Sequence, residues 1–172
     1  MDAITFIYQS ALEIPDVAFD KPANNILLPS LTHETIEKIG TDDRPVVIKK
    51  SVFEKNHKHH QELSPNDSRK VLNAALTEAD LIVNDKPSNK PNYWIIVNLS
   101  KDENAVVNID IDSKKQFIEV VGWRKVRDRS IEQIKNRAIR EGGQILITQK
   151  GAAGLSALTD STVSECKDNK NS

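Results

Sequence analysis

Apolar and polar positions alternate through the middle of the chain in four runs that have the two-residue period of β-strands. The runs read LIVN, YWIIVNLS, AVVNIDID and QFIEVVGW, and clusters of Asn, Pro, Lys or Asp separate them. Because short polar connections join neighbouring runs, the pattern predicts four strands in an antiparallel meander.

Helical periods stand on both sides of this meander. The predicted helices are residues 3–13, Thr32 to Gly40, SVFEKNHKHH, a helix opened by Ser64 and Pro65 that ends near Ala79, and Ser130 to Glu141. Short strands are predicted at Val46 to Ile48 and at QILIT. This order predicts an α+β fold, in which N-terminal helices precede a small antiparallel β-sheet meander and helices pack on one face of the sheet.

Composition sets the domain organisation that we expect. With 172 residues and 38% hydrophobic content, the chain is long enough for one domain with a core. We predict an N-terminal extension at residues 1–45, the main domain at residues 46–158 and a disordered polar tail at residues 159–172.

Cysteine use and hydropathy bear on the compartment. Cys166 is the single cysteine, so neither a disulfide nor a thiolate metal cluster can form within the chain. No apolar run has the length of a membrane span, and the first residues lack the pattern of a secretory signal. These features predict a soluble protein of the cytoplasm.

Charge is distributed unevenly along the chain. Between Ser113 and Lys150, ten Lys and Arg against four Asp and Glu give a charge of +6, which leaves −7 for the remainder of the chain at a net charge of −1. Five of the seven arginines lie between Arg124 and Arg140, and arginine is the side chain best suited to bidentate phosphate contacts. The alternative interpretation is a solvated helix face.

Alternation also predicts which side chains share the second face of the sheet. If helices cover the apolar face, the open face displays Trp94, Asn98, Asn108, Asp110, Glu119, Trp123 and Lys125. Exposed indoles can stack on nucleobases, and Glu119 could act as a general base. The alternative is a solvated face whose tryptophans are covered by the N-terminal segment.

Three of the four histidines lie in the stretch KNHKHHQELS. Helical phasing places His57 and His60 on one side of their helix and His59 on another. A metal site would need further ligands, and the H-E-x-x-H pattern is absent. Three interpretations therefore compete. One imidazole acts as an acid/base catalyst near a phosphodiester, or one histidine anchors the helix while the others are solvated, or, ranked last, His57 and His60 hold a metal ion.

Two longer runs suggest a family. The run VVIKKSVFEKNHKHHQELSPNDSRKVLNAALTEADLIV, followed by the meander and FIEVVGWRKVRDRSIEQIKNRAIREGGQILI, resembles the phage-associated barnase/EndoU/colicin/RelE-like (BECR) nuclease domains. The resemblance covers about Val46 to Lys150 and rests on the order of the elements. It implies a metal-independent ribonuclease that attacks through the ribose 2′-hydroxyl.

The resemblance also implies roles for particular residues. His60 matches the helix-end histidine of the family best, with His57 second. The resemblance also implies Arg124 and Thr148 as catalytic positions, and Lys125 and Lys150 beside them as substrate-binding positions. Independently of the family, phosphodiester cleavage needs a base, an acid and cations. This chemistry adds Glu119 as a catalytic residue, and it adds as substrate-binding residues Trp94, Trp123, Arg127 and Arg129. In this scheme His60 and Glu119 form an acid/base pair, and the arginines hold phosphates.

These observations together favour a toxin-like endoribonuclease associated with a phage or mobile element. We expect RNA, with tRNA among the candidates, as the substrate, and an immunity or antitoxin protein as an option for a partner. No cofactor, metal or membrane contact is expected, and the location is the cytoplasm of a bacterial host, with delivery in a virion as an option. The alternative is a non-catalytic phage accessory module that binds nucleic acid or protein. A nucleotide-transferring toxin ranks last, because no Gly-rich phosphate loop is present.

Overall fold

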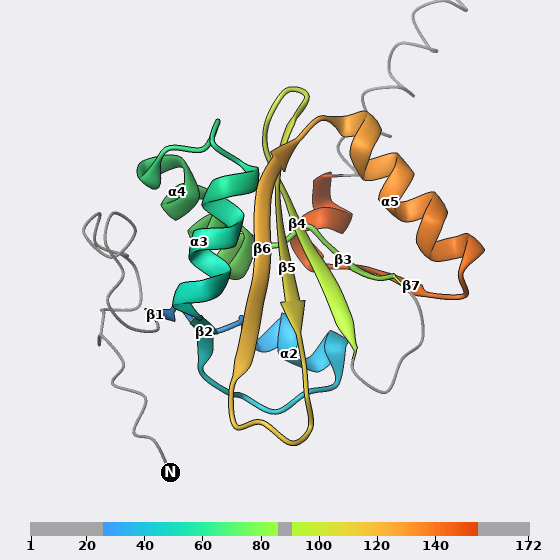
Figure 1. The fold of residues 1–172 in the computed structure, drawn as a ribbon. Coiled ribbons are helices and arrows are strands. Elements are labelled where there is room, and N and C mark those ends of the chain that lie inside the picture. Colours follow the sequence, from blue (N-terminus) through green and yellow to red (C-terminus); the bar gives the residue numbers. More distant parts are fainter. Residues whose placement is uncertain (1–25, 86–90, 155–172) are drawn as a thin grey trace, which may run out of the picture.

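The computed structural model describes residues 26–85 and 91–154 of the chain (Figure 1). The predicted helix at residues 3–13 and the predicted tail at 159–172 lie outside the described residues. The elements are β1 (Ile26–Leu28), α2 (His33–Ile39), β2 (Val46–Ile48), α3 (Lys50–His59), α4 (Pro65–Glu78), β3 (Leu81–Asn84), β4 (Asn92–Ser100), β5 (Glu103–Asp110), β6 (Ile118–Val126), α5 (Asp128–Arg140) and β7 (Gln144–Ile147). Residues 149–154 are also helical. The predicted α+β fold class is confirmed.

The strands form one sheet in the order β1-β2-β6-β5-β4-β3-β7. The predicted meander from β3 to β6 is antiparallel throughout, and β7 pairs antiparallel with β3. At the other end β2 lies parallel to β6, and β1 lies antiparallel to β2. β1 is thus part of the sheet, and the segment that carries β1 and α2 contributes side chains to the main core. Residues 26–45 therefore belong to the same domain as the strands and helices that follow them.

Local end signals set the boundaries of α2 and the start of α4 as the sequence predicts. The Thr32 hydroxyl accepts a hydrogen bond from the Thr35 backbone N–H, and Gly40 ends α2 in the left-handed conformation with φ of 75°. Ser64 caps α4 through a reciprocal pair of hydrogen bonds with Asp67, and Pro65 occupies the first helical position. These short-range interactions make both helix starts predictable from a few residues.

The main core lies between the sheet and the α3/α4 layer. Tyr93, Ile95 and Val97 of β4 point to this side, together with Val107 and Ile109 of β5. The buried face of α4 fills the space above them with Val71, Leu72, Ala75 and Leu76. Burial of this many aliphatic side chains supplies the main favourable free energy of folding.

A second, smaller core lies on the opposite face, beneath α5. It contains Val83, Ile96, Val106 and Ala138, with Ile131 and Ile134 packed against them. Figure 1 shows α3 and α4 on one side of the sheet and α5 on the other. The predicted packing of the helices on a single face is therefore incomplete, because α5 buries its own apolar stripe on the second face. Ile139, near the end of α5, lies outside this stripe and is 67% exposed.

A β-bulge in β6 changes which side chains reach each face. Asn108 pairs with Gly122 and Ile109 pairs with Val120, so the extra residue Val121 has no partner across β5. Beyond the bulge the odd-numbered residues turn to the main core. Trp123 is consequently buried there, 3% exposed, and its predicted place on the open face is wrong. Unbroken alternation could not reveal this reversal.

Candidate functional site

A small cavity lies where the C-terminal end of α3 meets strands β4, β5 and β6. Its volume is about 130 Å³, and its lining residues are Asn56, His60, Trp94, Val106, Asn108, Gly122, Trp123 and Arg124. Four of the residues singled out in the sequence, His60, Trp94, Trp123 and Arg124, thus come together. We call this the His60 pocket.

The edge of β6 explains how residues from both sides of the sheet share one cavity. β2 pairs with β6 only at Ile118 and Glu119. The part of β6 after Glu119 therefore has no neighbouring strand on that side among the described strands. The buried side chain of Asn56 takes the place of a strand, because its Oδ1 accepts a hydrogen bond of 3.1 Å from the Trp123 backbone N–H. This contact holds the end of α3 against the edge of β6.

His60 is held at the end of α3 by two hydrogen bonds. Its backbone N–H donates to the Asn56 carbonyl at 2.8 Å, and its Nδ1 lies 3.1 Å from Glu62 Oε1. The pKa of the Glu62 carboxyl lies below its ordinary value, first because of its own backbone N–H and then because of the His60 ring. In a neutral His60 ring, Nδ1–H then donates to Glu62, and Nε2 holds the lone pair that can accept a proton.

Arg124 lies on the second face of the sheet, against Trp94. Its guanidinium carbon is 5.3 Å from the centroid of the indole, a cation–π arrangement. Its Nε is buried without a hydrogen-bond partner, and so are Trp94 Nε1, Asn108 Oδ1 and Trp123 Nε1. Since buried polar atoms are normally paired, four unpaired ones around a single cavity are typical of a site that binds a polar ligand.

A second cavity adjoins the first beneath α5. Its volume is about 270 Å³, and its lining residues are Asp85, Trp94, Arg124, Val126, Ser130, Gln133, Ile134 and Arg137. Trp94 and Arg124 line both cavities. Arg137 adds a second guanidinium, paired with Asp85 at 3.1 Å. The two cavities together present two arginines, two indoles, an imidazole, a carboxylate and several amide and hydroxyl groups.

Glu119 does not line either of these cavities. Its carboxylate is 13% exposed and lies 2.9 Å from Lys49 Nζ and 2.5 Å from Lys115 Nζ. Burial raises its pKa, but the hydrogen bonds and charges of the two lysines outweigh burial and hold the pKa below its ordinary value. A carboxylate held ionised in this way is a weak base, and the carboxylate that contacts His60 is that of Glu62.

Three other predicted site residues have structural partners elsewhere. The buried Thr148 hydroxyl donates to the carbonyls of Ala79 and Asp80, at 2.6 and 3.1 Å. Lys125 is paired with Asp67 and Glu103, and Lys150 is paired with Asp80. None of the three lines the His60 pocket.

The remaining predicted residues are exposed. The ring of His57 stacks on Phe53, with centroids 6.4 Å apart, and Arg127 and Arg129 lie on the surface at the start of α5. In the part of the chain that the structure describes, no cluster of three or more His, Cys, Asp or Glu side chains has the arrangement of a metal site. No helix among the same residues is long and apolar enough to cross a membrane.

Sequence reasoning missed Glu62, Asn56 and Arg137 as members of the site. Asn56 lies four positions before His60, and Glu62 lies two positions after it. The spacing of Asn56 and His60 is a helical one, which gives a usable signal. Nothing in the sequence brings Arg137 to β4, because that contact depends on the packing of α5 against the sheet.

Comparison with known proteins gives one match. Residues 3–138 match the family model described as large polyvalent protein-associated domain 13. Neither a curated protein nor a solved structure matches the chain significantly. The match agrees with the phage association implied by the resemblance, and it does not identify a BECR nuclease. Because the match spans most of its length, the chain belongs to the phage-associated large polyvalent protein-associated domain 13 family.

Proposed function

We propose that this domain is a toxin-like endoribonuclease that cleaves RNA at the His60 pocket without a metal ion. One observation carries the proposal: an imidazole in contact with a carboxylate lines the same cavity as Arg124 and three other residues that each have a buried polar atom without a hydrogen-bond partner. An oriented base beside a cation is the arrangement that phosphodiester transesterification requires.

The proposed reaction uses one histidine for both proton transfers. His60 Nε2 takes the proton of the ribose 2′-hydroxyl, whose oxygen attacks the adjacent phosphorus. The bond from phosphorus to the 5′-oxygen of the next nucleotide breaks, and the imidazolium returns its proton to that oxygen. The products are a 2′,3′-cyclic phosphate and a 5′-hydroxyl, so atoms and charge balance.

Arg124 is the group proposed to stabilise the charge that develops on the phosphoryl oxygens. Its contact with Trp94 orients the guanidinium, and its unpaired Nε is available to an oxygen acceptor after a small side-chain movement. The neighbouring cavity beneath α5, with Arg137 and the other edge of Trp94, would take the adjoining nucleotide. RNA, with tRNA among the candidates, is the proposed substrate, and an immunity or antitoxin partner remains part of the proposal.

The competing proposal is a non-catalytic accessory module that binds nucleic acid or protein through the same basic surface. Arg127 and Arg129 support it, because both are exposed next to the cavity beneath α5. Binding by charge alone would weaken steeply with salt and would give no cleavage product.

The test is incubation of the full chain with total RNA and with tRNA, in the presence and absence of EDTA. We expect cleavage in both conditions and its loss, by about 100-fold or more, in His60→Ala. His59→Ala is the matched control, since His59 is exposed and does not line the pocket. Full activity in His60→Ala, or equal loss in both variants, would contradict the assigned role.

A second variant tests the cation. Arg124→Gln should lower the cleavage rate about 10- to 1000-fold, because the developing phosphoryl charge loses its guanidinium. Arg129→Gln should lower it by less than about threefold, because an exposed cation contributes only to general attraction. The measurement is single-turnover cleavage of one labelled RNA; equal effects of the two variants would favour the binding module.

A further inference from the structure

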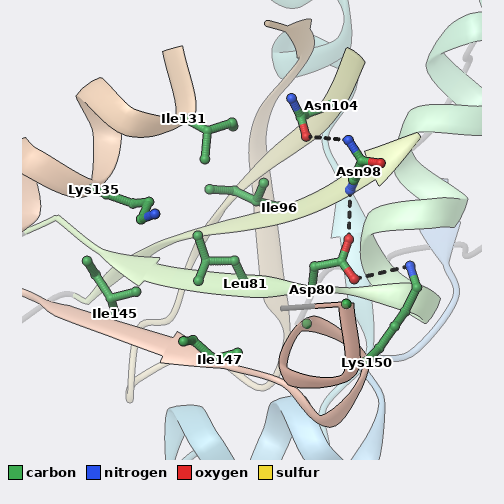
Figure 2. A pocket seen from close by; sticks show the side chains of 12 residues that line it. Asp80, Leu81, Ile96, Asn98, Asn104, Ile131, Lys135, Ile145, Ile147 and Lys150 are labelled. Carbon is green, nitrogen blue, oxygen red and sulfur yellow. Dashed lines mark hydrogen bonds and ion pairs between the residues drawn. The ribbon is translucent and has the colours of Figure 1, made fainter. Parts of the chain in front are cut away.

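A cavity larger than the His60 pocket lies apart from it, at the β4-β3-β7 end of the sheet (Figure 2). Its volume is about 580 Å³, within the usual range of small-molecule sites. Its apolar wall is built from Leu81, Ile96, Ile131, Ile145 and Ile147, which come from three strands and α5. We call this cavity the aliphatic groove.

The chemistry of the wall indicates the shape of its occupant. Among the residues that the structure describes, the large apolar side chains of the lining are all aliphatic, and none of the lining side chains is aromatic. Ile147 is 41% exposed, so its side chain is accessible to a molecule that enters the groove. Flexible aliphatic chains suit such a wall better than planar rings, which gain most from stacking on aromatic side chains.

The polar side chains on the other side of the groove are paired with one another. Figure 2 shows a chain of contacts along it: Asn98 Nδ2 donates to Asn104 Oδ1 at 3.1 Å, and the Asn98 backbone N–H donates to Asp80 at 2.8 Å. Asp80 in turn lies 3.3 Å from Lys150 Nζ. Within residues 26–85 and 91–154, Asp80 is the one carboxylate of the lining, and because Lys150 neutralises it, this side offers no unpaired negative charge there.

Lys135 supplies the remaining charge, from the α5 side of the groove and opposite Lys150 (Figure 2). Its ammonium is paired at 2.9 Å with Glu132, whose side chain is exposed. Exposed ion pairs of this kind are weak, so Lys135 can exchange Glu132 for an anionic group that enters the groove. Two lysines against one aspartate give the lining a net positive charge.

We propose that the aliphatic groove binds a single-chain amphiphile with an anionic head group, such as a medium-chain fatty acid. The aliphatic chain lies on Leu81, Ile96 and Ile147, and the carboxylate pairs with Lys135. This proposal is independent of RNA cleavage, because it uses no residue of the His60 pocket.

The test is calorimetric titration of the full chain with decanoate, below the concentration at which decanoate forms micelles. Decanol and decyltrimethylammonium are the neutral and cationic comparison ligands. We expect decanoate to bind more tightly than decanol, and the cation to bind most weakly. Equal affinities for all three, or no binding of decanoate, would overturn the proposal.

Three variants locate the site. Ile147→Glu should reduce decanoate affinity by about tenfold or more, because it places a charge against the aliphatic chain. Ile139→Glu is the matched control, since Ile139 is the other large exposed apolar residue and does not line the groove. Lys135→Gln should reduce affinity about two- to fivefold, as expected for a partly exposed ion pair.

Size-exclusion chromatography distinguishes a protein occupant from a ligand. If the chain forms a dimer that Ile147→Glu dissociates, and decanoate neither binds nor competes, the groove is a contact between two copies and the ligand proposal is wrong. Melting temperatures of both glutamate variants, expected to match that of the unsubstituted chain within a few degrees, establish that the fold is retained.

Discussion

His57 and His60 lie three positions apart, yet only His60 reaches the candidate site. Helical phasing predicts a shared side, but α3 ends at His59, and His60 takes the non-helical conformation with φ of −126° and ψ of 58°. This cap conformation separates the two rings: His57 stays exposed on Phe53, while His60 lines the cavity beside Glu62. A helix end predicted one residue too late was enough to make the histidines seem equivalent.

We expect Glu119 to contribute to the stability of the fold, in a way that depends on pH, and not to catalysis. Its folded-state pKa lies below the ordinary value of 4.5, so its ion pairs stabilise the fold fully above that pH and lose their effect as the pH falls through the lower, folded-state pKa. We expect Glu119→Gln to lower the free energy of unfolding by roughly 1–2 kcal/mol at pH 7 and by less at pH 3. Urea unfolding at both pH values measures this; a loss that is the same at both would contradict the ion-pair account.

Trp123 should act as a core residue and Trp94 as a residue of the site. Trp123→Ala removes an almost fully buried side chain packed against Phe53, and should cost about 3–5 kcal/mol in the free energy of unfolding. Trp94→Ala, at a half-buried position, should cost less and should lower RNA cleavage. Denaturant unfolding of both variants measures these losses. A decrease in the free energy of unfolding below about 0.5 kcal/mol for Trp123→Ala would place its indole on the surface.

At the scale of elements, the bulge in β6 decides which residues form the site. Alternation before the bulge would place Trp123 and Lys125 on the second face, whereas the extra residue Val121 gives that face to Arg124. The approach of α3 to the same strand depends on Asn56 and on the end of the β2 pairing. Both features are long-range, and a periodic pattern in one segment carries no information about either.

Asn56 should therefore couple the stability of the fold to the function of the site. Asn56→Ala leaves the Trp123 backbone N–H without its acceptor, and we expect a cost of about 1–2 kcal/mol after the better helix propensity of alanine is counted. RNA cleavage should fall as well, because α3 no longer holds His60 at the β6 edge. Lys55→Ala, at an exposed neighbouring position, is the control, and equal unfolding energies for the two variants would show that Asn56 does not hold α3.

For the whole molecule, the local parts of the fold could be predicted and the assembly of the site could only be predicted in part. The meander, the α2 and α4 boundaries and the α+β class follow from periodicity and capping at Thr32, Gly40 and Ser64. The parallel pairing of β2 with β6 and the position of α5 on the second face depend on tertiary packing. Of the residues predicted for the site, His60, Trp94, Trp123 and Arg124 line one cavity, whereas Glu119, Thr148 and Lys150 are held in other contacts.

The most direct measurement of the central claim compares two oligonucleotides of one sequence, one with ordinary riboses and one with every 2′-hydroxyl methylated. In EDTA, we predict that the chain cleaves the first, leaving 2′,3′-cyclic phosphate ends detectable by mass spectrometry, and leaves the second intact. Cleavage of both would show that the 2′-hydroxyl is not the nucleophile. Binding of both without cleavage of either would contradict the ribonuclease account and favour the binding module.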